Sequence, residues 1–223
     1  MPLVSAIMPT HGKDRFDWAL QAIDCYASQT YPNKELIILD DEDAPTFQRA
    51  PQGCRYSRIA GDAQMTIPEK RNRLCTLSNG EYIWHLDSDD WSASGRMMLQ
   101  IELLDASRRS VCGFSSMIFH VESTNDVFEY TSHRDYALGT SLCYRKSWWR
   151  GHRWGPLAIG SDNAFVRTAA YNNQLITIPG SGLMVARVHS GNTSIKNTTN
   201  PVYVRASTDR IPSAFHATAP SRT

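Results

Sequence analysis

Residues 80–91 read GEYIWHLDSDDW and join a short apolar run to a cluster of acidic residues. The aromatic and β-branched residues at 82–84 predict a buried strand. In open α/β sheets, ligands bind at the carboxyl ends of the strands. Side chains two residues apart on an extended segment point the same way, so Asp87 and Asp89 can share one cation. Because carboxylate oxygens favour Mg²⁺ or Mn²⁺, this stretch indicates a divalent metal site.

The same acidic residues are also typical of a turn and a helix N-cap. Asp90 or Ser92 is suited to begin a helix over about residues 93–106. An EF-hand loop fits poorly, because the sixth residue counted from Asp87 is Ser92 rather than Gly, and the twelfth is Met98 rather than Glu. The stretch alone favours neither the metal site nor the cap, so the rest of the chain decides.

Composition predicts one domain of ordinary size. The chain has 223 residues, of which 41% are hydrophobic, which is enough for a sizeable core. Its net charge of +1 gives no general argument for binding nucleic acid or an anionic membrane. Five widely spaced cysteines without a C-x-x-C motif are typical of reduced thiols. No run approaches the roughly 20 apolar residues of a membrane helix, so we expect a cytoplasmic protein without a transmembrane segment.

The first half of the chain alternates strands and helices. We expect strands at 3–8, 35–39 and 54–59 and helices at 16–28 and 66–78, the second helix opened by a capping box at 66–69. This order predicts an α/β fold with a doubly wound, mostly parallel sheet. Two of its strands end in paired aspartates.

The second half predicts a smaller antiparallel portion. The expected strands are 111–119, 127–131, 139–144, 175–178 and 183–188, with a helix at 162–171. We expect a single domain over 1–195, with halves at about 1–91 and 92–195. Residues 196–223 are rich in Thr, Ser, Pro and Ala, so we expect a C-terminal arm or a flexible tail.

Several common chemistries lack their motifs. The sequence has no G-x-G-x-x-G after the first strand, no Walker loop, no G-x-S-x-G and no H-E-x-x-H. A metal-assisted reaction on a phosphorylated substrate remains.

Six segments resemble, in order and spacing, the family-2 glycosyltransferases with the GT-A fold. They are Val4–Thr10, Ser28–Asp41, Lys70–Asn72, Gly80–Asp90, Gly160–Asn163 and Arg187–Ser194. Together they cover roughly residues 3–195. The resemblance implies transfer of a sugar from a nucleotide-diphosphate donor to an acceptor hydroxyl, with inversion at the anomeric carbon. It leaves open whether the acceptor is a glycan, a lipid-linked intermediate, a protein or a nucleic acid.

The resemblance also implies a donor site with Mn²⁺ or Mg²⁺ as its cofactor. Asp89, with Asp90, would hold the metal against the two phosphates, and His189 would be a third ligand or a residue that closes over the donor. The alternative for His189 is a surface or core histidine. The expected donor-binding residues are Pro9, Thr10, Asp40, Asp41, Lys70, Arg71, Asp87 and Ser88. For Lys70 and Arg71, a solvated helix face is an equal alternative.

Asp162 is the expected general base, because an acceptor hydroxyl must lose its proton to a nearby carboxylate during attack. The alternative is that Ser161 or Asp162 caps a helix. The family usually has Glu where this chain has Ser161, and the effect of that difference on activity stays open.

Residues 145–154 hold three tryptophans and four cationic residues without an acidic one. Aromatic rings stack on sugars or bases and arginine pairs with phosphate, so we expect Trp148, Trp149 and Arg150 on the acceptor side. The alternative is that the tryptophans pack in the core.

Two other functions compete with sugar transfer. A nucleotidyltransferase acting on a sugar phosphate also uses a doubly wound sheet, carboxylates and Mg²⁺, and His11-Gly12-Lys13 is a short version of its basic loop. A non-catalytic module would bind the nucleotide sugar without transferring it. The oligomeric state is not predicted.

Overall fold

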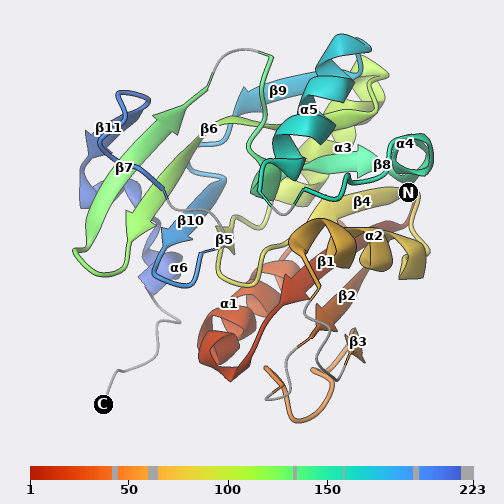
Figure 1. Cartoon of the computed structure of the whole chain (residues 1–223), viewed down its shortest axis with the longest axis horizontal. Coiled ribbons are helices and arrows are strands. Elements are labelled where there is room, and N and C mark those ends of the chain that lie inside the picture. The colour runs from red at the N-terminus through yellow and green to blue at the C-terminus, as the bar shows by residue number, and fades with distance from the viewer. Residues whose placement is uncertain (42–44, 60–64, 133–134, 158, 193–195, 217–223) are drawn as a thin grey trace.

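A mixed sheet with helices on both faces forms the body of the protein (Figure 1). The computed structural model describes residues 1–41, 45–59, 65–132, 135–157, 159–192 and 196–216. Eight of the eleven strands follow one another across the sheet in the order β11-β7-β6-β8-β4-β1-β2-β3. The other three strands lie off this order: β9 and β10 pair with β6, and β5 pairs with β10.

The N-terminal half supplies four parallel strands. They are β1 (Val4–Thr10), β2 (Lys34–Asp40), β3 (Cys54–Arg58) and β4 (Tyr82–His85). β1 lies between β2 and β4, and both of these pairs are parallel. The carboxyl ends of these strands therefore meet at one edge, where the acidic stretch follows β4. All four strands were predicted from the sequence, with small differences at their ends.

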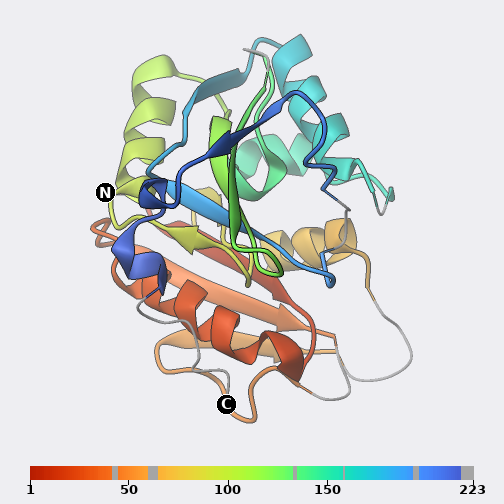
Figure 2. The same cartoon turned by 90° about the vertical axis from the view of Figure 1, so that its left-hand side faces the viewer.

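Helices cover both faces of the parallel strands (Figures 1 and 2). Ala6 and Met8 of β1 pack in one core cluster with α1 and α3, whereas Ile7 packs in a second cluster with α2, α4 and α5. The helices are α1 (Phe16–Ala27), α2 (Ile67–Leu77), α3 (Arg96–Ser107), α4 (Lys146–Gly151) and α5 (Ser161–Tyr171). Because successive side chains of a strand point to opposite faces, one strand serves both clusters. The expected doubly wound α/β fold is confirmed.

Two expected helix starts have different outcomes. Thr66 caps α2, and the Glu69 carboxylate accepts hydrogen bonds from its amide and its hydroxyl, so the predicted capping box is confirmed. In contrast, α3 begins at Arg96 after the N-cap Gly95. The idea that Asp90 or Ser92 caps this helix is therefore wrong. Residues 91–92 form the short strand β5 (Trp91–Ser92) instead.

The C-terminal half adds a portion in which β6 is central. β6 (Val111–Val121) pairs antiparallel with β7 (Asp126–Thr131) and β8 (Cys143–Arg145), and parallel with β9 (Leu175–Pro179) and β10 (Met184–Val188). The first half of the strand expected at 139–144 is wrong, because residues 139–141 form the 3₁₀ turn η2 (Gly139–Ser141). The Ser141 hydroxyl holds this turn by donating to the Leu138 carbonyl and accepting from the Phe114 amide.

Residues 196–216 form an arm that packs on both halves of the fold. β11 (Tyr203–Ala206) pairs antiparallel with β7, and η3 (Thr208–Arg210) leads to the short helix α6 (Ser213–His216). Phe215 of α6 is only 1% exposed and packs in a cluster with Cys25 and Val185. The expectation of a flexible tail therefore does not hold for these residues. Residues 217–223 lie outside the described part of the chain.

The cysteines are reduced and mostly buried, as expected. No described helix combines the length and the apolarity needed to span a bilayer. All five cysteines are free thiols, and all except Cys54 are buried. Burial raises the pKa of Cys75 to about 12, so this thiol stays protonated.

Replacement of Phe215 by alanine tests the docking of the arm. The change leaves a cavity among buried side chains and removes the ring over which Arg187 lies, at 4.0 Å from the ring centre. We expect the free energy of unfolding to fall by about 3 kcal/mol, measured by urea denaturation. Tyr171→Ala is the control, because Tyr171 is 92% exposed. Equal stability of both variants would contradict a docked arm.

Candidate active site

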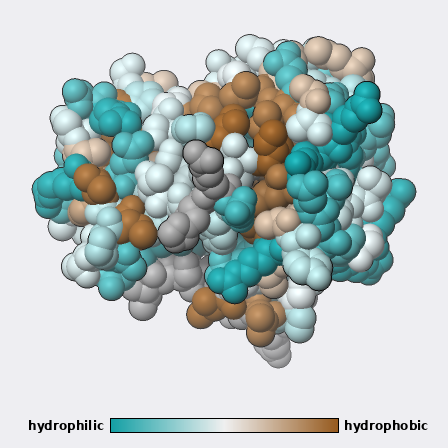
Figure 3. Space-filling model, turned by 90° about the horizontal axis from the view of Figure 1, so that it is seen from above, coloured by the Kyte–Doolittle hydropathy of each residue, from teal (hydrophilic) through white to brown (hydrophobic). Residues whose placement is uncertain are grey.

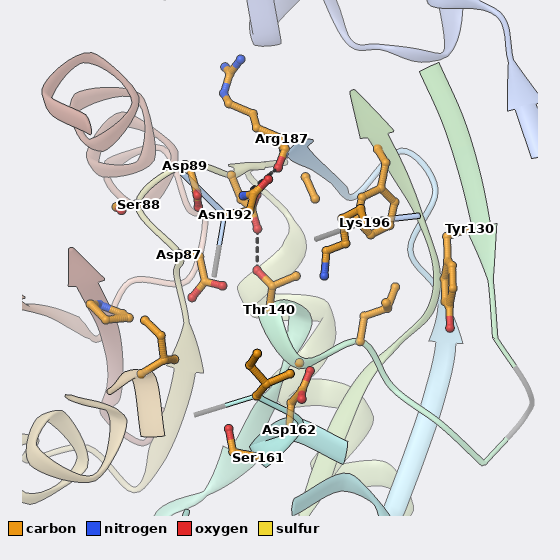
Figure 4. A pocket seen from close by; sticks show the side chains of 18 of the residues that line it. Asp87, Ser88, Asp89, Tyr130, Thr140, Ser161, Asp162, Arg187, Asn192 and Lys196 are labelled. Carbon is orange, nitrogen blue, oxygen red and sulfur yellow. Dashed lines mark hydrogen bonds between the residues drawn. The ribbon is translucent and has the colours of Figure 1, made fainter. Parts of the chain in front are cut away.

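A pocket of about 420 Å³ opens where the two halves of the sheet meet (Figure 4). Its wall begins at the carboxyl ends of β1 and β4 and continues past η2 and α5 to β6, β7 and β11. Seen from above, the surface is mostly hydrophilic, with hydrophobic side chains gathered near its centre (Figure 3). Ile159, which lines the pocket just before α5, is 69% exposed.

Asp87 and Ser88 face the pocket directly after β4. The side chain of Asp87 is 25% exposed, and an Arg71 guanidinium nitrogen lies 3.5 Å from its carboxylate. The hydroxyl of Ser88 is buried and has no hydrogen-bond partner among the described residues. Both residues line the pocket, and Asp87 is the more exposed of the two.

Asp89 forms an ion pair with Arg15 and a hydrogen bond with His189, which link distant parts of the chain. Its carboxylate lies 2.9 Å from an Arg15 guanidinium nitrogen and 3.0 Å from His189 Nε2. Burial alone would raise the pKa of Asp89, but the hydrogen bond with His189 and the charge of Arg15 outweigh it and lower the pKa. The Trp18 ring lies 4.4 Å from the His189 ring and supports its position. The structure thus brings together Asp89 and His189, as the sequence predicted.

Asp90 is held by protein groups on both carboxylate oxygens. The Thr140 hydroxyl donates to one oxygen and the Arg187 amide, 3.2 Å away, donates to the other. Burial, and then the neighbouring charges of Asp89 and Asp87, raise the pKa of Asp90 well above its usual value. Asp90 therefore connects residues 87–90, which we call the acidic loop, to η2 and β10. Because both oxygens of Asp90 are engaged, Asp89 is the better placed metal ligand.

The donor atoms suit a metal that arrives with phosphate. Among the described residues, no three His, Cys, Asp or Glu side chains are arranged to hold a metal ion. Mg²⁺ sites on phosphorylated substrates usually take one or two carboxylates, and phosphate and water supply the remaining ligands. Asp89 offers one such carboxylate, and the imidazole of His189 lies 3.0 Å from it.

Asp162 lies in the first turn of α5 and lines the pocket. Neither Ser161 nor Asp162 caps the helix, because the N-cap is Gly160, whose φ of 81° suits a residue without a side chain. The alternative role as a cap is therefore wrong. One carboxylate oxygen of Asp162 accepts a bond from the Asn163 amide at 3.0 Å.

Gly139 determines how closely α5 approaches η2. A Cβ atom at this position would lie 2.5 Å from the Cβ of Asp162, closer than atoms can pack. The carbonyl of the same residue accepts a hydrogen bond from His85 Nδ1 at 2.9 Å. Gly139 therefore touches both Asp162 and the strand that carries the acidic loop.

Two of the expected donor residues are already engaged inside the protein. The Asp40 carboxylate accepts bonds from the Thr46 amide at 2.6 Å and the Tyr56 hydroxyl at 2.8 Å. The Thr10 hydroxyl lies 3.3 Å from that of Thr46. Neither side chain lines the pocket, whereas Pro9 does.

Lys70 and Asp41 form a buried ion pair beneath the pocket. Lys70 Nζ lies 2.5 Å from the Asp41 carboxylate and donates to the Thr10 carbonyl at 2.9 Å. Burial alone would raise the pKa of Asp41, but hydrogen bonds from Lys70 and His11 outweigh it and lower the pKa. Burial lowers the pKa of Lys70 despite the pair. Neither side chain lines the pocket.

The suggestion of a solvated helix face is wrong for Lys70 and Arg71 of α2. Lys70 is 2% exposed and Arg71 is 6% exposed. Arg71 differs from Lys70 in lining the pocket, with its guanidinium 4.9 Å from the centre of the Trp154 ring. Arg71 is therefore the α2 cation that can contact a donor phosphate.

The structure does not bring the expected acceptor residues to the pocket. Trp148 and Trp149 are 9% and 3% exposed and pack in the core cluster between α2 and α5. Trp149 Nε1 donates to the Asn72 side chain at 2.9 Å, and the Trp148 ring stacks on His152. Arg150 is exposed and lines a separate hollow. The tryptophans turn inward because α4 needs an apolar face against the sheet.

Several pocket residues were not predicted from the sequence. Arg15 and Thr140 contact the acidic loop, and an aromatic surface lines the end formed by β6, β7 and β11. Its members are Phe119, Tyr130, Tyr136 and Tyr203. Tyr203 falls in the segment expected as an arm or tail. For Phe119 and Tyr130, the alternation of apolar and polar residues along 117–130 was the available signal, and Tyr136 had none.

Comparison with known proteins gives a family and a fold. Residues 5–167 match the family described as Glycosyl transferase family 2. In Escherichia coli (strain K12), the protein WcaA, named as a glycosyl transferase of colanic acid biosynthesis, is 34% identical over 94 residues. That match covers 40% of this chain and 33% of WcaA, so the chain spans about a third of the relative.

Solved structures share the fold at low identity. The structure of TarS 1–349 from S. aureus in complex with UDP-GlcNAc has a TM-score of 0.66 and 18% identity, covering 86% of this chain and 60% of that one. The mannosyltransferase PcManGT from Pyrobaculum calidifontis, in complex with GDP-Man and Mn²⁺, has a TM-score of 0.59 and 13% identity, covering 84% and 56%. These likenesses confirm the expected GT-A type of fold.

Replacement of Lys70 by methionine tests the buried pair. Asp41 has a lowered pKa in the folded protein, so its ionised form stabilises the fold above its unfolded pKa of about 3.9, and this contribution is lost as the pH falls. Without Lys70, the buried carboxylate lacks its cation, and its pKa rises. We expect a loss of about 3 kcal/mol at neutral pH that shrinks in acid, as Asp41 of the variant takes up a proton.

Urea denaturation of the Lys70→Met variant at several pH values measures this loss. Arg73→Met is the matched control, because Arg73 is an exposed cation on the same helix. A loss that stays constant with pH would show that Lys70 acts through packing alone.

Proposed function

The chain belongs to glycosyl transferase family 2, and from that premise we propose that its pocket transfers a sugar from a nucleotide-diphosphate donor to an acceptor hydroxyl with inversion. One observation carries the proposal. Asp87 and Asp89 from the end of β4 and Asp162 from α5 line the same pocket, on different sides of it (Figure 4). Asp87 and Asp89 are thus placed to serve the donor, and Asp162 is placed to serve the acceptor.

The donor lies at the β1 and β4 end of the pocket. Pro9, Asp87 and Ser88 bound this space, and the Arg71 guanidinium brings a positive charge to it. The Ser88 hydroxyl beside this space is buried and has no hydrogen-bond partner among the described residues. The nucleotide sugars in the complexes of TarS and PcManGT support a donor of this class.

Asp89 and His189 would hold a divalent cation, Mn²⁺ or Mg²⁺, at the donor site. When bound, such a cation would supply positive charge that stabilises the departing nucleoside diphosphate. The Mn²⁺ in the PcManGT complex supports this use of a metal in the fold. Arg15, which already lies 2.9 Å from Asp89, adds a second positive charge to the same region.

Asp162 accepts the proton of the attacking hydroxyl. A carboxylate that lines the pocket apart from Asp87 and Asp89 suits inversion, because attack and departure occur on opposite faces of the anomeric carbon. The approach of Gly139 to Asp162 fixes where this base lies. Ser161, buried beside it, takes the position that is Glu in most of the family.

We place the reaction in the cytoplasm. Five free thiols suit a reducing compartment. The identity of the acceptor is taken up below, from the residues beyond Asp162.

Asp162→Asn keeps the shape of the side chain and removes its capacity to take up a proton. We expect transfer to fall by about 10²- to 10⁴-fold. Release of nucleoside diphosphate from a panel of nucleotide sugars, with soluble saccharides as acceptors, measures it. Asp24→Asn on exposed α1 is the control. Full activity of the Asp162 variant, or release of pyrophosphate in place of nucleoside diphosphate, would overturn the proposal.

Asp89→Asn tests the metal and donor site without an acceptor. In the wild type, a nucleoside diphosphate with Mn²⁺ at about a hundred times its dissociation constant adds about 2.7 kcal/mol of stability, visible as a thermal shift. We expect Asp89→Asn to lose the part of this shift that EDTA removes, and Asp24→Asn to keep it. Absence of any nucleotide-dependent shift in the wild type would refute the donor site.

A further inference from the structure

Three aromatic residues from three strands pack together at one end of the pocket, and we call them the aromatic wall: Phe119 of β6, Tyr130 of β7 and Tyr203 of β11. Phe119 is only 2% exposed and lies behind the two partly exposed tyrosines. Tyr203 lies directly opposite Tyr130 in the antiparallel register, with ring centres 5.0 Å apart. Phe119 lies on the neighbouring strand, 6.0 Å from Tyr130 and 5.4 Å from Tyr203. Residues opposite one another in such a pair share a face of the sheet, so the three rings line one side.

The aromatic wall lies at the opposite end of the pocket from the acidic loop. In the sheet order, β8 and β6 separate β4 from β7, and β11 lies beyond β7. With strands about 4.8 Å apart, this spacing puts several strand widths between the two ends. Figure 4 shows Asp87 on one side, Tyr130 on the other and Asp162 between them. The wall is therefore beyond the base as seen from the donor, where an acceptor must lie.

The chemistry of the wall suits a sugar ring. Tyr130 and Tyr203 are partly exposed, and neither hydroxyl has a hydrogen-bond partner among the described residues. Burial raises the pKa of both phenols, so they remain neutral hydrogen-bond donors. A sugar offers C–H groups to an aromatic face and hydroxyls to a polar tip, and a tyrosine presents both surfaces.

We propose that the aromatic wall is the subsite for the sugar residue that carries the acceptor hydroxyl, so the acceptor is a carbohydrate. This inference rests on the proposed function and specifies its substrate class. Two of the three rings come from residues 119–130, and the third comes from the arm, beyond the residues 5–167 that match the family. The arm thus gives this chain an acceptor contact of its own.

Beside the pairing of β11 with β7, two contacts that follow β11 in the chain hold the arm in place. Arg210 pairs with Glu129 of β7 at 3.2 Å. Gln21 of α1 donates to the Phe215 carbonyl at 2.8 Å. A single-residue loss of the ring at 203 therefore leaves the strand pairing and the docking of α6 in place.

Binding to an array of immobilised mono- to trisaccharides tests the proposal, with the labelled full chain as the probe. We expect the wild type to bind a subset of the saccharides, and Tyr203→Ala and Tyr130→Ala to bind them about tenfold or more weakly. Tyr203→Phe keeps the ring and is expected to retain most of the binding. Tyr171→Ala, with an exposed tyrosine on α5 outside the pocket, is the matched control.

The thermal shift with nucleoside diphosphate and Mn²⁺, measured on the same samples, separates the two proposals and verifies folding. An unchanged shift with lost saccharide binding supports the subsite. Unchanged saccharide binding in both alanine variants overturns it. A wild type that shifts with nucleotide but binds no saccharide also overturns it and leaves sugar transfer to another acceptor class. A wild type that binds neither overturns both proposals.

Discussion

The mutual repulsion of three carboxylates within four residues is the constraint around which this fold is arranged. Asp87, Asp89 and Asp90 follow a buried strand, and Asp89 and Asp90 are themselves buried, so these two carboxyl groups need partners from the protein. Each is matched by a partner from another segment of the chain. The partners are Arg71 of α2, Arg15 of η1 (Lys13–Arg15) with His189 after β10, and Thr140 of η2 with the amide of Arg187. The partners of the acidic side chains therefore come from four distant segments of the chain, which meet at one pocket.

Local physical chemistry made much of the first half predictable. Buried parallel strands read as unbroken apolar runs, and Val4–Thr10 is buried at every residue. The capping box at 66–69 depends only on residues three positions apart, so it can be predicted without knowing the tertiary structure. The predicted partnership of Asp89 with His189 came from a family resemblance, because the two residues are a hundred positions apart.

The rest depended on contacts that the sequence does not display. Trp148 and Trp149 look like ligand contacts by composition, yet burial of a short helix against the sheet accounts for them. The aromatic wall needs the register between β7 and β11 before Tyr130 and Tyr203 become neighbours. The arm itself is polar in composition, and its order rests on one strand pairing and a few buried side chains such as Phe215.

Gly139 has a consequence for how the two ends of the pocket are related. Its carbonyl bonds to His85 at the end of β4, and its α-carbon lies against Asp162. The separation between the acidic loop and the α5 carboxylate is therefore set by one main-chain turn inside a rigid sheet. A side chain at position 139, which itself lines the pocket, would change this separation.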